Sequence, residues 1–199
     1  MIAGTARGIR LEAASAGTRP LSDRVKQSLF ASLEAEGALT DGFLDLYAGT
    51  GAAGIEALSR GADRATFVEH DAKACSLIAA NVKRARVDGW QVVRDDVLRY
   101  LAKGLAAAQR PYRAAIADPP YDTALLAPTL ELLGDVQHRW LADGAVVVAK
   151  HFWRAAFEAQ VGGLTLERQR RFGETMVSFY RQTGTTTPGS RPEENAERT

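Results

Sequence analysis

The stretch LDLYAGTGAAG, residues 44–54, decides the fold expected for this chain. An apolar run suited to a buried strand leads into a glycine-rich turn and then into a helical pattern. Gly49, Gly51 and Gly54 give the spacing G-x-G-x-x-G, which allows a tight turn and the close approach of a ligand to backbone N–H groups. Glu69 follows at the end of the next expected strand, where a carboxylate can accept both hydroxyls of a ribose. The stretch therefore predicts a nucleoside-binding loop.

On either side of this loop, the chain alternates between strand-like apolar runs and helical patterns. The expected parallel strands are 43–48, 65–70, 90–94, 113–118 and 145–151, and the helices between them are 52–60, 72–86, 96–109 and 123–139. Two further strands, 164–171 and 175–182, are separated by Gly173 and indicate an antiparallel hairpin. The pattern predicts an α/β, Rossmann-like fold with a seven-stranded, mostly parallel sheet and helices on both faces.

The two ends of the chain have different characters. Residues 2–12 alternate weakly and indicate a short strand or arm, after which Ser22 can cap a helix that ends near Gly37. Residues 184–199 are almost free of apolar side chains and are expected to be a disordered tail. We therefore expect one domain over 1–183, with an arm and helix in 1–40 and the catalytic core in 41–183.

Composition limits the classes of protein that the chain can be. The 199 residues are 46% hydrophobic and 25% charged, which is typical of a soluble globular domain. One cysteine cannot form an internal disulfide, and this fits a reducing cytoplasm. A net charge of +1 excludes a polycation. Residues 1–30 nevertheless hold five basic side chains against two acidic ones, and a second basic cluster is Arg168, Arg170 and Arg171. Such clusters mark either a polyanion-binding surface or a solvated charged face.

Asp45 bears on which nucleoside the loop would bind. A nicotinamide dinucleotide and S-adenosylmethionine (SAM) both fit the glycine spacing. An acidic residue inside the first strand favours SAM, because it can neutralise the ammonium of the amino-acid portion, whereas it would repel a pyrophosphate. The alternative is that Asp45 only hydrogen-bonds the loop.

The third strand ends in Asp95 and Asp96 within VVRDDVLRYL, residues 92–101. A carboxylate here can accept the exocyclic amine of adenine, while Val97 offers its backbone N–H to the ring. Asp96 is preferred for this contact, because Asp95 can begin a cap for the helix that follows.

The fourth strand ends in ADPPY, residues 117–121. Proline fixes its own φ and restricts the residue before it, so Asp118 and Tyr121 would be held at a stiff corner. A carboxylate and a fixed backbone carbonyl could accept the hydrogens of a nucleobase amine as a methyl group arrives, and the tyrosine could stack on the base. The simpler alternative is a strand terminator.

Four stretches resemble the RsmD-like family in order and spacing: GTRPLSDRVKQSLFASL, LDLYAGTGAAGIEALSRGA, FVEHD and ADPPY. The closing RRFGETMVSFY is similar to that family's final hairpin, so the resemblance covers about residues 2–182. It implies a class I SAM-dependent methyltransferase that acts on the N2 amine of a guanine in small-subunit (16S) ribosomal RNA, of the guanine-966 type. The opening MIAGTARG, Leu21 and Ala31 depart from the family pattern, which bears on the RNA contacts only.

The resemblance also implies roles for individual residues. SAM would be contacted by Asp45, Tyr47, Ala48, Gly49, Gly51, Glu69, His70, Asp96 and Val97. The guanine would be held by Asp118, Pro119, Pro120 and Tyr121. From charge, we expect Arg7, Arg10, Arg19 and Arg24 to face the RNA, although Arg24 could instead form a salt bridge that fixes the first helix.

The expected partner is 16S rRNA, within an assembling or assembled 30S subunit or as free RNA, and we expect a cytoplasmic monomer without a metal or a membrane segment. Three alternatives remain at this stage. The first is an amino methyltransferase for adenine N6 or guanine N2 of another RNA or DNA. The second is a nicotinamide dehydrogenase, which Asp45 disfavours. The third is a non-catalytic RNA-binding assembly factor.

Overall fold

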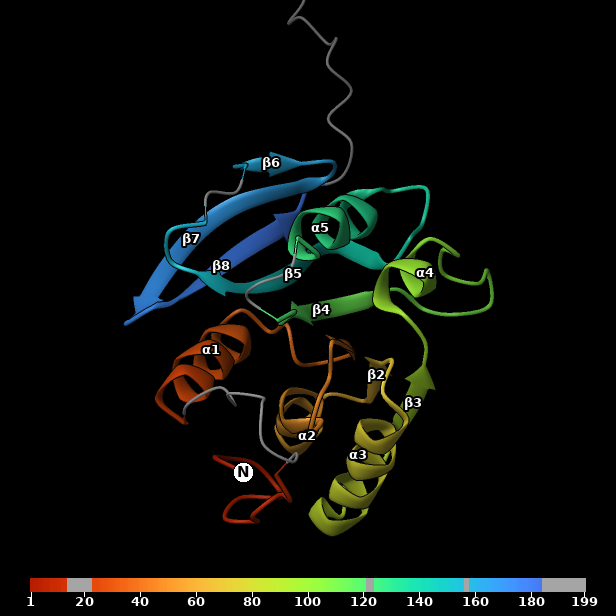
Figure 1. Ribbon diagram of the computed structural model, residues 1–199, viewed down its shortest axis with the longest axis vertical. Coiled ribbons are helices and arrows are strands. Elements are labelled where there is room, and N and C mark those ends of the chain that lie inside the picture. The colour runs from red at the N-terminus through yellow and green to blue at the C-terminus, as the bar shows by residue number, and fades with distance from the viewer. Residues whose placement is uncertain (14–22, 121–123, 156–157, 184–199) are drawn as a thin grey trace, which may run out of the picture.

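The structure is a computed structural model that describes residues 1–13, 23–120, 124–155 and 158–183. These residues form one eight-stranded sheet in the order β3-β2-β1-β4-β5-β8-β7-β6, with helices on both faces (Figure 1). The strands are β1 (Gly42–Leu46), β2 (Arg64–Glu69), β3 (Trp90–Arg94), β4 (Tyr112–Ala117), β5 (Leu141–Phe152), β6 (Gln160–Val161), β7 (Leu164–Phe172) and β8 (Thr175–Gln182). The helices are α1 (Asp23–Ala35), α2 (Ala52–Ser59), α3 (Ala72–Ala85), α4 (Val97–Leu101) and α5 (Leu126–Gly134).

Strands β1 to β5 are parallel, and β5, β8, β7 and β6 are antiparallel. The register brings the carboxyl ends of the parallel strands to one edge of the sheet. Leu46 of β1 pairs with Ala117 of β4, which in turn pairs with Ala149 of β5. Polar residues that follow these positions are therefore neighbours in space, and we call this border the carboxyl edge.

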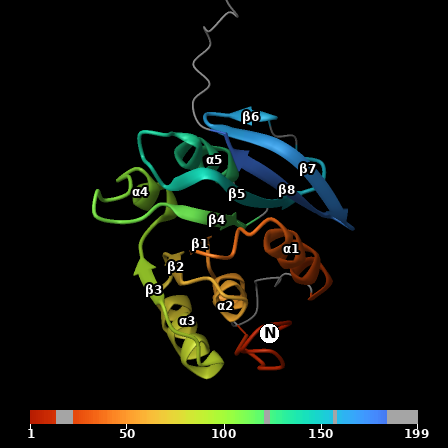
Figure 2. The same ribbon diagram turned by 180° about the vertical axis from the view of Figure 1, so that it is seen from behind.

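The two faces of the sheet carry separate apolar cores, as expected for a parallel sheet buried on both sides. Helices α1, α2 and α3 cover one face and α4 and α5 the other, as the opposite views in Figures 1 and 2 show. Alternate residues of β1 divide between them, with Phe43 in the first core and Leu44 in the second. Gly54 lets α2 approach the sheet closely, because a Cβ there would lie only 2.3 Å from the ring of Phe67.

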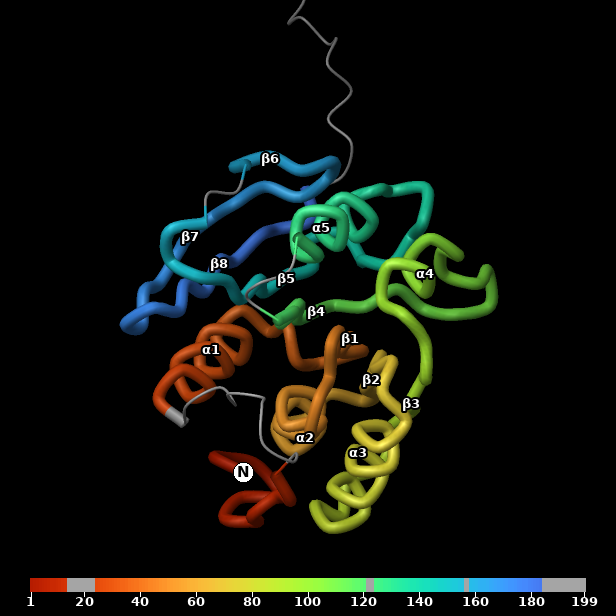
Figure 3. Tube along the Cα trace, viewed as in Figure 1, coloured from red at the N-terminus to blue at the C-terminus, as the bar shows by residue number. Residues whose placement is uncertain are grey.

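The N-terminal arm, residues 1–13, forms turns rather than the short strand that was one of the two expectations. Gly4 and Gly8 have positive φ, which bends the backbone away from an extended path. The arm lies against α2 (Figure 3), where the fully buried Glu56 accepts hydrogen bonds from the backbone N–H groups of Ile2 and Ala3 at 2.9 and 3.0 Å. Further along, Asn81 of α3 bonds the backbone of Glu12.

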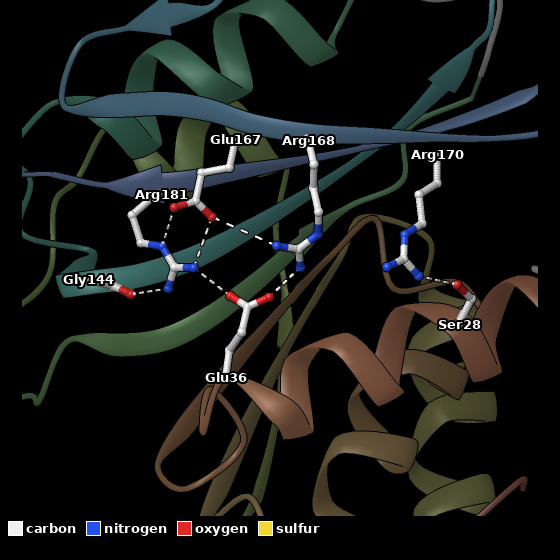
Figure 4. A network of polar contacts seen from close by, with 7 residues as sticks. All are labelled: Ser28, Glu36, Gly144, Glu167, Arg168, Arg170 and Arg181. Carbon is white, nitrogen blue, oxygen red and sulfur yellow. Dashed lines mark hydrogen bonds and ion pairs between the residues drawn. The ribbon is translucent and has the colours of Figure 1, made fainter.

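The C-terminal hairpin is joined to α1 by a cluster of charged side chains (Figure 4). Glu36, just after α1, pairs with Arg168 of β7 and Arg181 of β8. Arg181 also bonds Glu167 at 2.8 and 2.9 Å. These partly buried groups neutralise one another, so Arg168 of the predicted basic cluster is a structural residue.

Three expectations from the sequence need correction. The sheet has eight strands rather than seven, because residues Gln160–Val161 form the short strand β6 against β7. Helix α4 stops at Leu101 rather than continuing to 109, since Gly104 at φ +69° donates its N–H to the carbonyl of Leu101 and closes the turn. Helix α5 is likewise shorter than predicted. Ser22 and the tail 184–199 lie outside the described residues, and no described helix is long and apolar enough to cross a membrane.

Candidate active site

The predicted cofactor loop leaves β1 at the carboxyl edge and turns sharply into α2. Tyr47, Gly49 and Gly51 have φ of 60°, 55° and 76°, so three nearby residues are left-handed. The N–H of Gly51 donates to the carbonyl of Ala48 at 2.7 Å, which closes the turn. Such a loop, followed by the free N–H groups of a helix N-terminus, can approach a polar ligand through its backbone.

Asp45 is buried on β1 and bonds the backbone where the loop enters α2. Its Oδ2 accepts a hydrogen bond from the N–H of Gly54 at 2.8 Å, which is the loop-bracing role considered as an alternative from the sequence. Burial raises the pKa of Asp45 to about 8, and the charges of Asp118 and Glu69 add to this rise while the Gly54 bond opposes it. Asp45 on β1, Glu69 at the end of β2 and Asp118 just after β4 are thus close enough for the other two carboxylates to affect the ionisation of Asp45.

Glu69 connects the end of β2 to the loop. One carboxylate oxygen accepts the N–H of Gly49 at 3.0 Å and the other accepts the N–H of Asp71 at 2.9 Å. The exposed ring of His70 lies 3.0 Å from Glu69. These contacts orient Glu69, and because a carboxylate oxygen can accept more than one bond, Oε2 can still bind a hydroxyl group of a ligand.

Tyr47 points to the second face of the sheet, where its hydroxyl bonds the hydroxyl of Thr129 in α5 at 2.8 Å. Burial raises its pKa, and the nearby charge of Asp96 contributes. Tyr47, which follows β1, and Asp96, which lies between β3 and α4, are therefore neighbours at the carboxyl edge.

Asp96 caps helix α4, although the sequence suggested that Asp95 would do so. Asp96 is the N-cap of α4, with its carboxylate accepting the N–H of Arg99 at 2.9 Å, so the expectation that Asp95 begins the cap is wrong. Asp95 instead pairs with Lys103 and Arg99, which lower its pKa to about 2. Asp96 is exposed and Val97 begins the helix, so both could still contact a base, and this contact stays a prediction.

The acceptor corner follows β4. Asp118 is partly exposed, Pro119 is buried and Pro120 is exposed, while Tyr121 lies outside the described residues. Burial raises the pKa of Asp118, and the ammonium of Lys150 opposes the rise. Lys150 approaches both carboxylate oxygens, at 2.7 and 2.8 Å. Sequence reasoning missed this lysine, although a cation inside the apolar run of β5 was a visible signal.

The arginines that were expected to face RNA do not form one group. Arg7, Arg10 and Arg24 are exposed, and Arg19 lies outside the described residues. Arg7 follows Ala6, whose N–H donates to Ser59 at the far end of α2 from the loop. Arg24 is the second residue of α1, and no ion pair links it to another part of the chain that the structure describes, so the salt bridge considered as an alternative for Arg24 is not seen there.

Another basic group, which was not assembled from the sequence, lies at the carboxyl edge. Trp153 follows β5, and the guanidinium groups of Arg154 and Arg171 lie 4.8 and 3.8 Å from its ring centroid. Register explains their position, since Met176 of β8 pairs with both His151 and Arg171. Within the described ranges, no His, Cys, Asp and Glu side chains are grouped as metal ligands.

This arrangement has known counterparts. The solved structure of the Escherichia coli protein yhhF superposes with a TM-score of 0.78 at 30% identity, covering 92% of this chain and 96% of that one. YlbH of Bacillus subtilis is 37% identical over 190 residues, which is 92% of this chain and 99% of YlbH. Ribosomal RNA small subunit methyltransferase D of Escherichia coli K12 is 32% identical over 184 residues, or 92% of this chain and 89% of that protein.

The strand order and the loop after β1 define a Rossmann-like class I methyltransferase fold, as predicted from the sequence. Residues 1–181 match the family described as Conserved hypothetical protein 95. The chain belongs to this family, and the predicted membership of the RsmD-like group is confirmed.

Proposed function

We propose that this protein transfers a methyl group from SAM to the exocyclic N2 amine of a guanine in 16S rRNA, the guanine-966 type of reaction. One observation carries the proposal: a carboxylate at the end of β4 is the immediate neighbour of the nucleoside loop after β1. A relative that is named a small-subunit rRNA methyltransferase supports rRNA as the substrate class. The motif ADPPY supports an exocyclic amine as the acceptor, and the choice of guanine N2 rests on the resemblance to the RsmD-like family.

The residues at the loop suit SAM as the cofactor. Glu69 is oriented by two backbone bonds and can accept ribose hydroxyls, and Asp96 and Val97 could recognise adenine. The cluster of acidic groups suits a cofactor with two cationic groups, and a cation near Asp45 would favour its ionised form. When bound, SAM supplies a methyl group on a positively charged sulfur.

The acceptor corner would act on the guanine. Asp118 would accept a hydrogen bond from the N2 amine and then take the proton that the amine loses as the carbon–nitrogen bond forms and the carbon–sulfur bond breaks, which would leave a neutral thioether. Pro119 and Pro120 would hold the backbone still during this step, and Tyr121 would stack on the base, a contact worth about 1–3 kcal/mol. Positioning of the amine against the methyl group would supply much of the rate enhancement.

A basic surface beside this corner could bind the RNA backbone. Its exposed members are Arg24 at the start of α1, Arg154 after β5, and Arg170 and Arg171 near the end of β7. Arg170 also bonds Ser28 of α1 at 2.8 Å, which joins the two sides of this surface (Figure 4). Phosphate contacts of this kind position a nucleic acid without reading its sequence. We retain Arg7, Arg10 and Arg19 as proposed contacts for more distant RNA.

The experiment uses purified protein, labelled SAM and 30S subunits that lack the modification, with free 16S rRNA in parallel. Nuclease digestion should yield labelled N2-methylguanosine. Label in N6-methyladenosine would favour the adenine alternative, and SAM binding without transfer to any RNA would favour a non-catalytic assembly factor. Comparison of the two substrates also shows whether the protein acts on the 30S subunit or on free RNA. We further propose that the protein is cytoplasmic and monomeric, and sedimentation of the purified protein tests the monomeric state.

A further inference from the structure

Lys150 is a charged residue in an apolar part of the sheet. It follows four buried apolar residues of β5, Val146–Ala149, and only 8% of its side chain is exposed. Strand register fixes its position, because Ala149 pairs with Ala117 and the next residues along are Lys150 and Asp118. The lysine is thus held next to the acceptor corner by the backbone of two adjacent strands.

The contact between the two side chains involves both carboxylate oxygens. The ammonium nitrogen of Lys150 lies 2.7 Å from Oδ1 and 2.8 Å from Oδ2 of Asp118. An ammonium centred between the two oxygens restricts rotation of the carboxylate. Each oxygen keeps a further acceptor site, so the pair does not block an incoming amine.

The groups around Asp118 make this cation important. Asp45 on β1 lies near Asp118, but its own pKa is raised to about 8, so it is protonated and uncharged at neutral pH in the cofactor-free protein. On β5, the ring of His151 bonds Ser178 of β8 and belongs to the other face. Burial therefore favours a protonated Asp118, and the ammonium of Lys150 opposes this effect.

A protonated Asp118 could not serve the proposed reaction. The N2 amine is a hydrogen-bond donor that must lose a proton, and a neutral carboxyl group accepts a proton far less readily than a carboxylate does. Removal of Lys150 would take away the charge that opposes the effect of burial, and the pKa of Asp118 would rise further.

We propose that Lys150 is a positioning residue of the transfer site, which keeps the Asp118 carboxylate ionised and fixed in orientation for the incoming amine. This inference rests on the proposed function for its consequence in catalysis. The dependence of the ionisation of Asp118 on Lys150 can be tested without any RNA substrate.

The direct test follows the carboxyl carbon of Asp118 by ¹³C NMR during a pH titration of the cofactor-free protein. Lys150→Met should raise the titration midpoint by at least about one pH unit, and Lys150→Arg should stay near wild type. Lys150→Gln keeps a hydrogen-bond donor but has no charge, and it should raise the titration midpoint of Asp118 as Lys150→Met does. Lys150→Gln replaces the buried cation with a polar side chain, so the same titration can be made on this variant if Lys150→Met does not fold. Lys103→Met, which removes the partner of Asp95, is the matched control and should leave Asp118 unchanged.

The second test compares pH profiles of methyl transfer. In Lys150→Met the acid limb of kcat should also move to higher pH, with SAM affinity within about threefold of wild type. If the Asp118 midpoint and the profile both stay in place, the inference is overturned and the pair is only structural. If Asp118 shifts but no variant or wild type methylates guanine, the inference about Lys150 stands and the proposed function fails.

Discussion

Asp45 shows how the surroundings of a single carboxyl group decide what it contributes. It lies on a strand that is buried on both faces, and burial raises its pKa to about 8 from an ordinary value of 3.8. The folded protein therefore binds a proton at Asp45 over a pH range in which the unfolded chain has released it. The bound proton stabilises the fold fully below about pH 4, and this contribution is lost as the pH rises to about 8.

We predict that Asp45→Asn removes this part of the pH dependence. Asparagine keeps an acceptor for the N–H of Gly54 and has no charge to desolvate. Between pH 6 and 8, the free energy of unfolding of the cofactor-free wild type should fall by up to about 1.4 kcal/mol per pH unit relative to the variant. Urea denaturation at each pH measures the difference. If the free energy of unfolding changed equally with pH in the two proteins, the raised pKa assigned to Asp45 would be contradicted.

Asp118 provides the second residue-scale prediction. Asp118→Ala should abolish methyl transfer, because the amine loses its acceptor, and it should leave SAM binding within about tenfold, because the loop contacts lie on β1 and β2. Single-turnover transfer and calorimetric SAM binding measure the two effects. Asp143→Ala, an exposed residue near the start of β5, is the control. Loss of SAM binding in Asp118→Ala would mean that the two sites are not separate.

At the scale of elements, the charged cluster at Glu36 holds α1 against the hairpin. We predict that Glu36→Gln lowers the free energy of unfolding by about 1–3 kcal/mol, since Arg168 and Arg181 lose a partly buried partner. Glu12→Gln is a matched control, because Glu12 pairs with Arg84 and both side chains are about half exposed. Its effect should stay below about 1 kcal/mol. An equal loss of unfolding free energy in the two variants would show that burial of the cluster does not add to stability.

The sequence predicted most elements, because apolar runs and glycine turns are local signals. Its errors came from contacts between distant residues. The two-residue strand β6 has no periodicity of its own and exists only by pairing with β7. The end of α4 was missed because Leu105 continues the apolar pattern past Gly104.

The same reason explains the gaps at the candidate site. The motifs gave the loop, Glu69 and Asp118, which lie at the ends of predicted strands. The pairing of Lys150 with Asp118 and the docking of the arm on Glu56 depend on strand register and helix packing. A single sequence does not encode these in any local pattern.

At the scale of the whole molecule, acidic and basic groups are divided along the carboxyl edge. The acidic groups of β1, β2 and β4 gather at the strand ends, and the exposed arginines lie on the neighbouring hairpin and α1. This division suits a small cationic cofactor on one side and a polyanion on the other. It also explains how a chain with a net charge of only +1 could bind RNA.

We predict that the double substitution Arg154→Gln and Arg171→Gln weakens RNA binding and reduces its salt dependence. For single-stranded RNA, each lost phosphate contact should lower the slope of log affinity against log salt by about 0.7. Arg139→Gln, an exposed residue before the start of β5, is the control and should bind as wild type does. Filter binding at several salt concentrations measures the slopes. An unchanged slope in the double variant would exclude this surface as the RNA contact.

The outermost strands have a consequence for behaviour at high concentration. On one side the two residues of β6 cover only the start of β7, whose remaining length carries the exposed Arg170 and Arg171. On the other side the sheet ends in the five residues of β3, where Gln91 and Arg94 are exposed. Borders with polar and charged side chains are poor templates for adding a strand from a second molecule. Self-association through sheet extension is therefore disfavoured, so crowding in the cell should not drive this fold toward fibrous aggregates.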